Sequence, residues 1–207
     1  MTGPGINGPA AGEGPSGGMD RFTVDAQGWM RGVRHVPSPN YDARPPGAAI
    51  ELIVVHSISL PAGRFGTEDV ERLFTNRLDT AQPGYGDLAG LKVSAHLFIR
   101  RDGEVVQFVP FAARAWHAGV SRWQGRERVN DFSVGIELEG TDRGPFEDSQ
   151  YRALIDVTRA LAMVYPAVDS ERLCGHSDIA PGRKTDPGPF FDWARYRAAL
   201  AAASDPE

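Results

Sequence analysis

The segment from Leu173 to Pro189 concentrates side chains that can do chemistry. It reads LCGHSDIAPGRKTDPGP and holds a histidine, two aspartates, a lysine and an arginine, with three glycines and three prolines among them. Because Gly and Pro fix unusual backbone angles, the composition predicts a shaped loop rather than a helix or a regular strand. His176 and Asp186 are of the residue types that hold a divalent metal. A solvated polar turn is the structural alternative for the same residues.

A second histidine, His56, stands near the end of the run Ala48–Ile58, AAIELIVVHSI. This nearly continuous apolar, β-branched run predicts a strand buried on both faces. Open α/β sheets present functional groups at the carboxyl ends of their strands, which makes His56 a candidate site residue. A core histidine with both ring nitrogens satisfied is the structural alternative.

A carboxylate lies inside the predicted strand Phe132–Glu139, FSVGIELE. The period of two places on one face Val134, Ile136 and Leu138, and on the other Gly135, Glu137 and Glu139. Burying a carboxylate without a partner is expensive, so Glu137 is a candidate functional group. The alternatives are structural: an internal salt bridge from Glu137 to Lys184, or a Lys184 that is simply a loop charge facing solvent.

The remaining patterns predict the elements that would position these groups. Helices are expected at Thr67–Phe74, Glu147–Tyr165 and Phe191–Ala203, a hairpin at Ser94–Arg100 and Glu104–Val109 with its turn at Asp102-Gly103, a short strand at Arg172–Cys174, and irregular segments at His35–Gly47 and Thr75–Leu91. This order predicts an α/β (α+β) fold, a single domain with a central mixed β-sheet flanked by helices.

Length and composition bound the class of protein. A chain of 207 residues with 41% hydrophobic residues can bury one core, and its net charge of −5 argues against nucleic-acid or membrane-surface partners. The Gly/Pro-rich residues 1–20 are expected to be a disordered tail, and residues 21–205 the folded domain. The single cysteine, Cys174, excludes an internal disulfide. With neither a secretory signal nor a membrane span apparent, we expect a cytoplasmic protein.

Five motifs occur together and in order along the chain: VVHSISLP, SAHLFIRRDGEVVQFVPF, RAWHAGVS, GRERVNDFSVGIELEGT and GHSDIAPGRKTDPGP. In these motifs the chain resembles the N-acetylmuramoyl-L-alanine amidases of the AmpD type, which are cytoplasmic zinc enzymes of peptidoglycan recycling. The resemblance extends from about Trp29 to Tyr196 and leaves out only the N-terminal tail.

The resemblance implies one tetrahedral Zn²⁺ per chain, held by His56, His176 and Asp186 with water as the fourth ligand. Two histidines and one carboxylate are typical of a catalytic zinc site with one open position. By the same resemblance Glu137 is the general base that later delivers the proton to the leaving amine, and Lys184 stabilises the oxyanion. Asp178 is then a turn cap rather than a ligand.

The implied reaction is hydrolysis of the amide between the lactyl group of (1,6-anhydro-)N-acetylmuramic acid and L-alanine, in 1,6-anhydromuramyl peptides. Five residues are candidates for substrate binding: Trp116, His117, Arg128, Asn130 and Lys92. Trp116 offers a face for a sugar ring, and guanidinium groups grip carboxylates of a peptide. His96 is expected to be a hydrogen-bonded neighbour of the site. We expect a monomer.

Two other function classes remain open. A non-haem iron oxygenase could use His176, Asp178 and a distant histidine as a facial triad, and iron content with dependence on an oxo-acid would reveal it. A non-catalytic peptidoglycan-recognition module would bind wall fragments tightly without turnover. Retention of every ligand argues against the recognition module.

Overall fold

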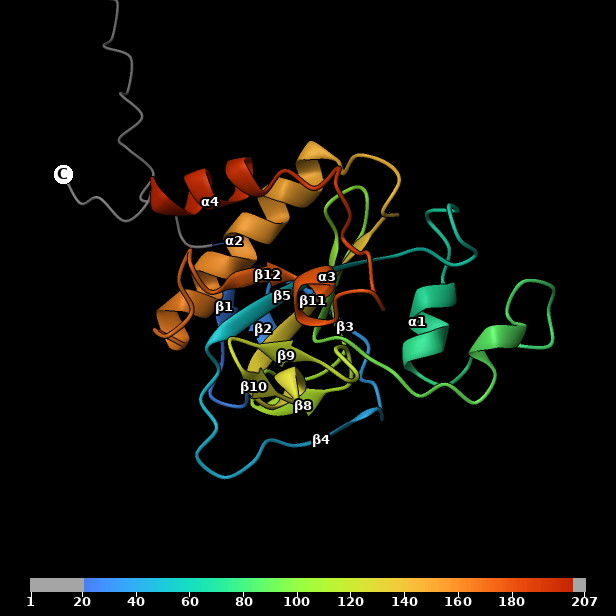
Figure 1. Cartoon of the computed structure of the whole chain (residues 1–207), viewed down its shortest axis with the longest axis horizontal. Coiled ribbons are helices and arrows are strands. Elements are labelled where there is room, and N and C mark those ends of the chain that lie inside the picture. The colour runs from blue at the N-terminus through green and yellow to red at the C-terminus, as the bar shows by residue number, and fades with distance from the viewer. Residues whose placement is uncertain (1–20, 203–207) are drawn as a thin grey trace, which may run out of the picture.

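The computed structural model of the chain describes residues 21–202. The tail expected at residues 1–20 and the last residue of the predicted C-terminal helix, residue 203, lie outside the described part. Helices α2 (Asp148–Val164) and α4 (Trp193–Ala201) lie together along one side of a central sheet, whereas α1 (Asp69–Phe74) and the 3₁₀ helix η1 (Gly86–Leu88) lie at the opposite end of the view (Figure 1).

The central sheet is mixed, as predicted. Its six strands are ordered β12 (Leu173–Gly175), β5 (Leu52–Ile58), β11 (Ser133–Glu139), β6 (Leu97–Ile99), β7 (Val105–Gln107) and β3 (Arg34–His35). The first four run parallel, β7 is antiparallel to β6, and β3 is parallel to β7. The three two-stranded sheets of the described residues pair β1 (Thr23–Val24) with β2 (Met30–Arg31), β4 (Tyr41–Ala43) with β8 (Ala113–Ala115), and β9 (Arg122–Trp123) with β10 (Arg126–Glu127).

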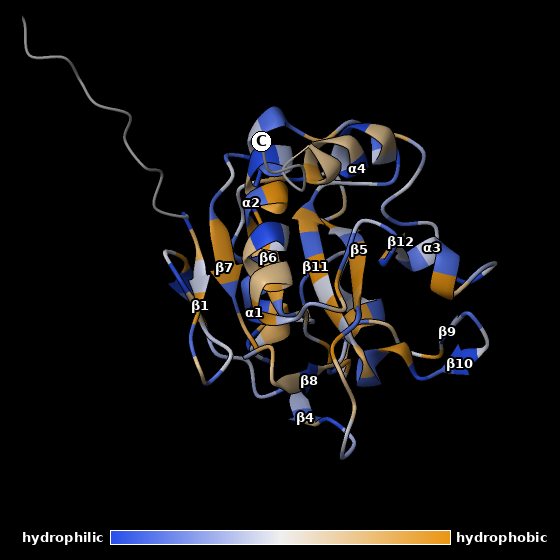
Figure 2. Cartoon of the chain, turned by 90° about the vertical axis from the view of Figure 1, so that its left-hand side faces the viewer, coloured by the Kyte–Doolittle hydropathy of each residue, from blue (hydrophilic) through white to orange (hydrophobic). Residues whose placement is uncertain are grey.

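Alternate residues of the central strands belong to different cores. The main core packs the sheet against α2 and α4 and takes from β5 and β11 the residues Ile53, Val55, Val134, Ile136 and Leu138. Leu52 and Val54 instead pack in a second cluster with Val129 and Cys174. Figure 2 shows the apolar colouring of these strands. By the period of two, His56 and Glu137 lie on the face turned away from α2, as the alternation of β11 predicted.

Most predicted elements are present with shifted ends. The hairpin is confirmed, with Ile99 opposite Val105 and Gly103 at φ 87° in the turn. The long helix starts one residue later than predicted and ends one earlier. Its first turn is closed by the side chain of Gln150, which accepts from the backbone N–H of Glu147 at 3.0 Å. The irregular segment Thr75–Leu91 contains only the short helix η1.

Two predicted boundaries are wrong. The helix expected from Thr67 begins at Asp69, because the Thr67 hydroxyl donates to the carbonyl of Leu60 at 2.5 Å. The short strand expected at Arg172–Cys174 is present as β12, one residue later, but the one-turn helix α3 (His176–Ile179) stands where a loop was predicted. The reason is that the prolines of this segment begin only at residue 181, so that the preceding residues are free to pair and coil.

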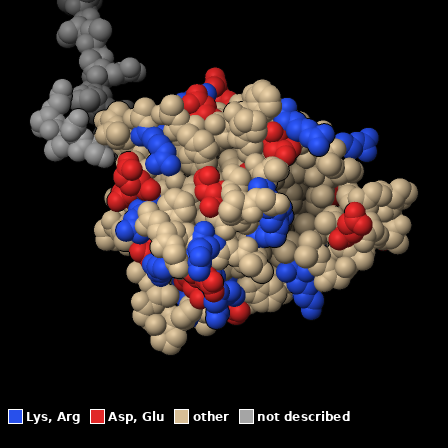
Figure 3. Space-filling model, in the orientation of Figure 1, with Lys and Arg blue, Asp and Glu red and all other residues tan. Residues whose placement is uncertain are grey.

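The surface charge is mixed. Basic and acidic side chains are interspersed over the face that Figure 3 displays. Among the described residues, no helix combines the length and the apolar character that crossing a bilayer requires.

Candidate active site

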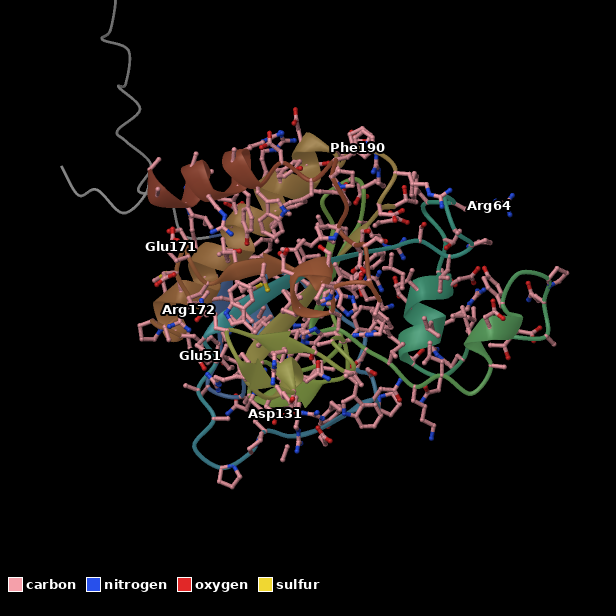
Figure 4. The ribbon with its side chains drawn as sticks, in the orientation of Figure 1. Glu51, Arg64, Asp131, Glu171, Arg172 and Phe190 are labelled. Carbon is pink, nitrogen blue, oxygen red and sulfur yellow. The ribbon has the colours of Figure 1, made fainter. Side chains whose placement is uncertain are left out.

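Three neighbouring parallel strands end at the same edge of the sheet. In the register of β5 with β11, His56 stands opposite Glu137, and in that of β5 with β12, Val55 stands opposite Gly175. His176 follows Gly175 directly and therefore emerges beside His56. At the opposite ends of these two strands Arg172 pairs with Glu51 at 3.2 Å, and Figure 4 labels both residues. The parallel register therefore gathers residues that are far apart in the sequence.

Three side-chain atoms converge at this edge. The Nδ1 atoms of His56 and His176 are 3.0 Å apart, and Asp186 Oδ2 lies 3.3 Å from the first and 3.2 Å from the second. Tetrahedral zinc with bonds of about 2.0–2.1 Å separates its ligand atoms by about 3.3 Å. The observed spacing therefore fits one metal ion of that size.

The protonation of these groups also fits a cation. Burial is the main influence that lowers the pKa of His56, to about 4, so its ring is neutral at neutral pH. Burial would raise the pKa of Asp186, but its close contacts with the His176 and His56 rings outweigh burial and hold that pKa well below its usual range. The Nε2 of His176 faces the carbonyl of Ala118 at 3.2 Å, which can only accept, so Nδ1 of His176 carries the lone pair. These residues are the one candidate metal cluster found among the described residues.

Glu137 is a buried carboxylate with an unused oxygen. The residue is 9% exposed, and its Oε2 has no hydrogen-bond partner among the described residues. Burial, and next the charge of Asp186, raise the pKa of Glu137 well above its ordinary value, while Lys184 opposes the rise. Glu137 and Lys184 form no ion pair among the described residues, so the salt bridge considered from the sequence is absent.

A small cleft opens beside the metal-ligand residues. It has a volume of about 300 Å³ and is lined by Ser57, Ile58, Ser59, Ala62, Gly140, Thr141, Asp142, Arg183, Lys184, Thr185 and Asp186. Lys184 is exposed on the wall of this cleft. Its ammonium group can therefore meet a bound molecule without first breaking an ion pair.

Comparison with known proteins decides the family. Residues 46–189 match the family model of the N-acetylmuramoyl-L-alanine amidases. The chain belongs to the N-acetylmuramoyl-L-alanine amidase family. The resemblance found in the sequence motifs is thereby confirmed.

Individual amidases show how far the similarity extends. The 1,6-anhydro-N-acetylmuramyl-L-alanine amidase AmpD of Escherichia coli is 58% identical over 176 residues, which cover 84% of this chain and 96% of AmpD. A crystal structure of a selenomethionine AmpD derivative matches with a TM-score of 0.82 and 57% identity, over 86% of this chain and 98% of that one. AmiD from E. coli, solved with the substrate anhydro-N-acetylmuramic acid-L-Ala-D-γ-Glu-L-Lys, matches at 28% identity and a TM-score of 0.54, over 85% and 65% of the two chains.

Two residues expected to bind substrate lie elsewhere in this amidase. His117 is 8% exposed, and its Nδ1 is 2.9 Å from Nε2 of His56. Asn130 is buried, and its Oδ1 accepts the backbone N–H groups of His117 and Ala118 at 3.2 and 2.8 Å. The His117 ring therefore contacts a ligand histidine, and the Asn130 side chain contacts the backbone next to it. Neither side chain is placed as the predicted substrate contact requires.

The other three candidates are accessible. Trp116 is half-buried next to His117 in the chain. Arg128 is exposed and lines a cavity of about 570 Å³ together with Arg183 and residues of α3, while pairing with Asp131 at 3.2 Å. Lys92 lines a separate cavity of about 160 Å³ between α1 and η1. The cavity at Lys92 shares no lining residue with the cleft beside Asp186.

The sequence interpretation missed Arg44, Ser133 and the role of Gly135. Arg44 is mostly buried and donates to the carbonyls of Phe111, Asn130, Asp131 and Ser133. A Cβ on Gly135 would lie 2.3 Å from Cγ of His117, so only glycine admits that ring. A glycine inside a strand is a signal of such close approach, whereas nothing in the Pro-rich segment marked Arg44.

The remaining candidates behave as the amidase resemblance implies. Asp178 is exposed and its Oδ2 accepts the backbone N–H of Gly175 at 2.7 Å, which confirms a cap. The oxygenase alternative is wrong because the chain belongs to the amidase family, and the candidate metal cluster contains Asp186 rather than Asp178. His96 is a hydrogen-bonded neighbour, since its Nδ1 accepts from the N–H of Gly135 at 3.1 Å. Cys174 is buried, and burial raises the pKa of its thiol.

Proposed function

We propose that this amidase uses one bound Zn²⁺ to hydrolyse the amide between the lactyl group of (1,6-anhydro-)N-acetylmuramic acid and L-alanine, in peptidoglycan recycling. The observation that carries the proposal is the convergence of His56, His176 and Asp186 beside the unpartnered carboxylate of Glu137. The substrate class is supported by the name of the AmpD relative and by the ligand in the AmiD complex. A recognition module without turnover would have no use for a buried, unpartnered Glu137.

The metal would be held by Nδ1 of His56, Nδ1 of His176 and Oδ2 of Asp186. These atoms offer two ring nitrogens and one carboxylate oxygen at the mutual distances a tetrahedral ion requires. When bound, the ion supplies Lewis acidity, which makes water more acidic near neutral pH and polarises a carbonyl. One ligand position is left for water or substrate.

The chain itself supplies the proton transfers. We assign to Glu137 Oε2 the removal of a proton from the attacking water and its delivery to the nitrogen of the departing L-alanine. The free lone pairs of this oxygen make it available for both tasks. Lys184, on the cleft wall, would place its ammonium against the negative charge that develops on the carbonyl oxygen.

We assign substrate recognition to the three accessible candidates outside the cleft lining. Trp116 would stack against the sugar, while Arg128 and Lys92 would bind carboxylates of the peptide. We also propose that the enzyme acts as a monomer, since all four central residues come from one chain, and that it works in the cytoplasm, as the resemblance to the recycling amidases implies. Size-exclusion chromatography with light scattering tests the monomer.

The function is tested by supplying purified protein with an anhydromuramyl tripeptide and following release of the free tripeptide by mass spectrometry. Zinc content is measured on the same preparation. We expect about one zinc per chain, turnover by the wild-type protein, loss of bound zinc in His176→Ala, and loss of turnover with zinc retained in Glu137→Ala. Full activity in either variant contradicts the assigned roles, and tight binding without turnover in the zinc-loaded wild type would support the recognition module.

A further inference from the structure

A series of hydrogen bonds joins His56 to His117, Ser133 and the carbonyl of Val129. Which atom donates in each bond follows from the carbonyl at the end of the series. The carbonyl of Val129 can only accept, and Ser133 Oγ lies 2.7 Å from it. The single hydroxyl proton of Ser133 is therefore committed to Val129. Ser133 Oγ lies 3.3 Å from Nε2 of His117, and with its own proton used it must accept there. His117 thus carries its proton on Nε2 and a lone pair on Nδ1.

The same reasoning continues to the candidate metal ligand. Nδ1 of His117 is 2.9 Å from Nε2 of His56. Because the His117 nitrogen is an acceptor, Nε2 of His56 must be the donor. His56 is then left with its lone pair on Nδ1, the atom that faces His176 and Asp186.

The second ligand histidine depends on the next residue of the same segment. Nε2 of His176 donates to the carbonyl of Ala118, which follows His117 in the chain. Asn130 accepts the backbone N–H groups of both His117 and Ala118, and Arg183 donates to the Ala118 carbonyl at 2.8 Å. Two consecutive residues therefore contact the outer nitrogens of both ligand rings, and one asparagine holds them in place.

The position of the His117 ring is tightly defined. The ring is buried against Gly135, where no side chain could be accommodated, and its plane meets that of His56 at 85°. A ring so confined can hold only one orientation relative to His56. The arrangement therefore restricts both the place and the proton of the ligand ring.

We propose that His117, with Ser133 behind it, is a positioning residue that presents Nδ1 of His56 to the metal, and that the Ala118 carbonyl does the same for His176. This rests on the proposed function in taking His56 and His176 as the zinc ligands. Outer hydrogen bonds of this kind fix the tautomer of a ligand histidine, and their loss typically costs about 10–100-fold in metal affinity. The role replaces the substrate contact predicted for His117 and Asn130.

The tautomers are measured directly by long-range ¹H–¹⁵N correlation spectra of the histidine rings in the zinc-loaded protein, because without a cation the two Nδ1 atoms and Asp186 Oδ2 would face one another as three acceptors. We expect His56, His117 and His176 each to carry the proton on Nε2. In Ser133→Ala, which frees Nε2 of His117, we expect a detectable population of His117 protonated on Nδ1. A proton on Nδ1 of His56 or His117 in the wild type overturns the proposal, as does a Ser133→Ala spectrum identical to that of the wild type.

Zinc affinity, measured by competition with a chromophoric chelator, provides a second readout. His117→Phe removes both ring nitrogens and should weaken zinc binding about 10–100-fold. His117→Asn places an amide oxygen near the former Nδ1 as an acceptor and should recover most of that loss. Equal losses in the two variants, with equal melting temperatures of the metal-free proteins, would show a packing role only and overturn the proposal. If His117→Phe does not fold, the zinc affinities of Ser133→Ala and His117→Asn are compared with that of the wild type instead.

The two proposals fail in different ways. A wild-type protein that binds zinc tightly, together with unchanged affinity in folded His117→Phe, contradicts the positioning role and leaves the metal site intact. A wild-type protein that binds no zinc contradicts the metal site, and the spectrum of the His117 ring, which faces Ser133 rather than the centre, still decides whether the hydrogen bonds run in the predicted direction.

Discussion

Two buried glutamates on the same face of β11 differ in whether their oxygens have hydrogen-bond partners. Glu139 is buried with both oxygens used, Oε1 by the N–H of Gly66 at 2.5 Å and Oε2 by the N–H of Arg101 at 3.1 Å. Glu137, two residues earlier, is buried with one oxygen unpartnered. Burying a carboxylate oxygen without a partner costs free energy, so such an oxygen is expected where it has a chemical role.

The residue-scale prediction contrasts these two carboxylates. Glu137→Gln preserves size but cannot accept a proton, so kcat should fall about 10²–10⁴-fold while zinc content is unchanged. Glu139→Gln disturbs only backbone contacts and should lower thermal stability with kcat retained. Steady-state kinetics, metal analysis and thermal melts measure the three quantities. A Glu139→Gln variant as inactive as Glu137→Gln would show that the assay reports damage to β11 rather than loss of a base.

At the scale of elements, the short helix α1 depends on one buried ion cluster. The Glu71 side chain is 11% exposed and receives Arg34 at 2.6 Å and Arg100 at 2.5 Å. Hydrogen bonds from Arg34 are the largest influence and, with Arg100, lower the pKa of Glu71 below 4.5 in spite of burial. The cluster joins α1 to β3 and to the end of β6, and so holds the segment that leads into the long insertion.

The stability that Glu71 contributes should depend on pH. Its pKa is lower in the folded chain than in the unfolded one, so the stabilisation is complete above pH 4.5 and is lost as the pH falls through the folded value. Glu71→Gln should therefore lower the free energy of unfolding by about 1–3 kcal/mol at pH 7, and the difference should narrow below pH 4.5. Urea unfolding across this range measures it.

Glu104 provides the matched control for this cluster. It pairs with the same two arginines, but its side chain is 39% exposed. Exposed ion pairs contribute little, so Glu104→Gln should change stability by less than about 1 kcal/mol. If Glu71→Gln lowers the free energy of unfolding equally at pH 7 and at acid pH, its effect comes from packing rather than from charge.

At the scale of the whole molecule, the candidate metal site exists only when the chain is folded. His56 and His176 are 120 positions apart, and three parallel strands bring them together. A site assembled from distant segments binds metal in the native state and not in the unfolded chain, so binding free energy becomes folding free energy.

Zinc should accordingly raise the melting temperature. At a free zinc concentration about 1,000 times Kd the stabilisation is about 4.1 kcal/mol, or roughly 8–16 °C for a domain of this size. Differential scanning calorimetry with and without a chelator measures the shift. His176→Ala, which lacks one ligand, should show almost none. An equal shift in that variant would place the stabilising zinc at some other site.

Much of the fold could be predicted because it depends on local pattern. The apolar run of β5, the alternation of β11, the Asp102-Gly103 turn and the spacing of α2 each follow from backbone geometry and burial within a few residues of sequence. The one-turn helix α3 was missed, because four residues are too few to show a helical period in the sequence.

The candidate site, too, could be predicted only in part from the sequence. From the sequence alone came the residue types that can ligate zinc, the position of His56 at a strand end and the carboxylate inside β11. Only the tertiary structure decided that His117 and Asn130 lie behind the ligands and that Nδ1 of each ligand ring faces the centre. The reason is physical: the proton on an imidazole is placed by whatever lies against its other nitrogen, and those partners are 61 and 58 positions away along the chain.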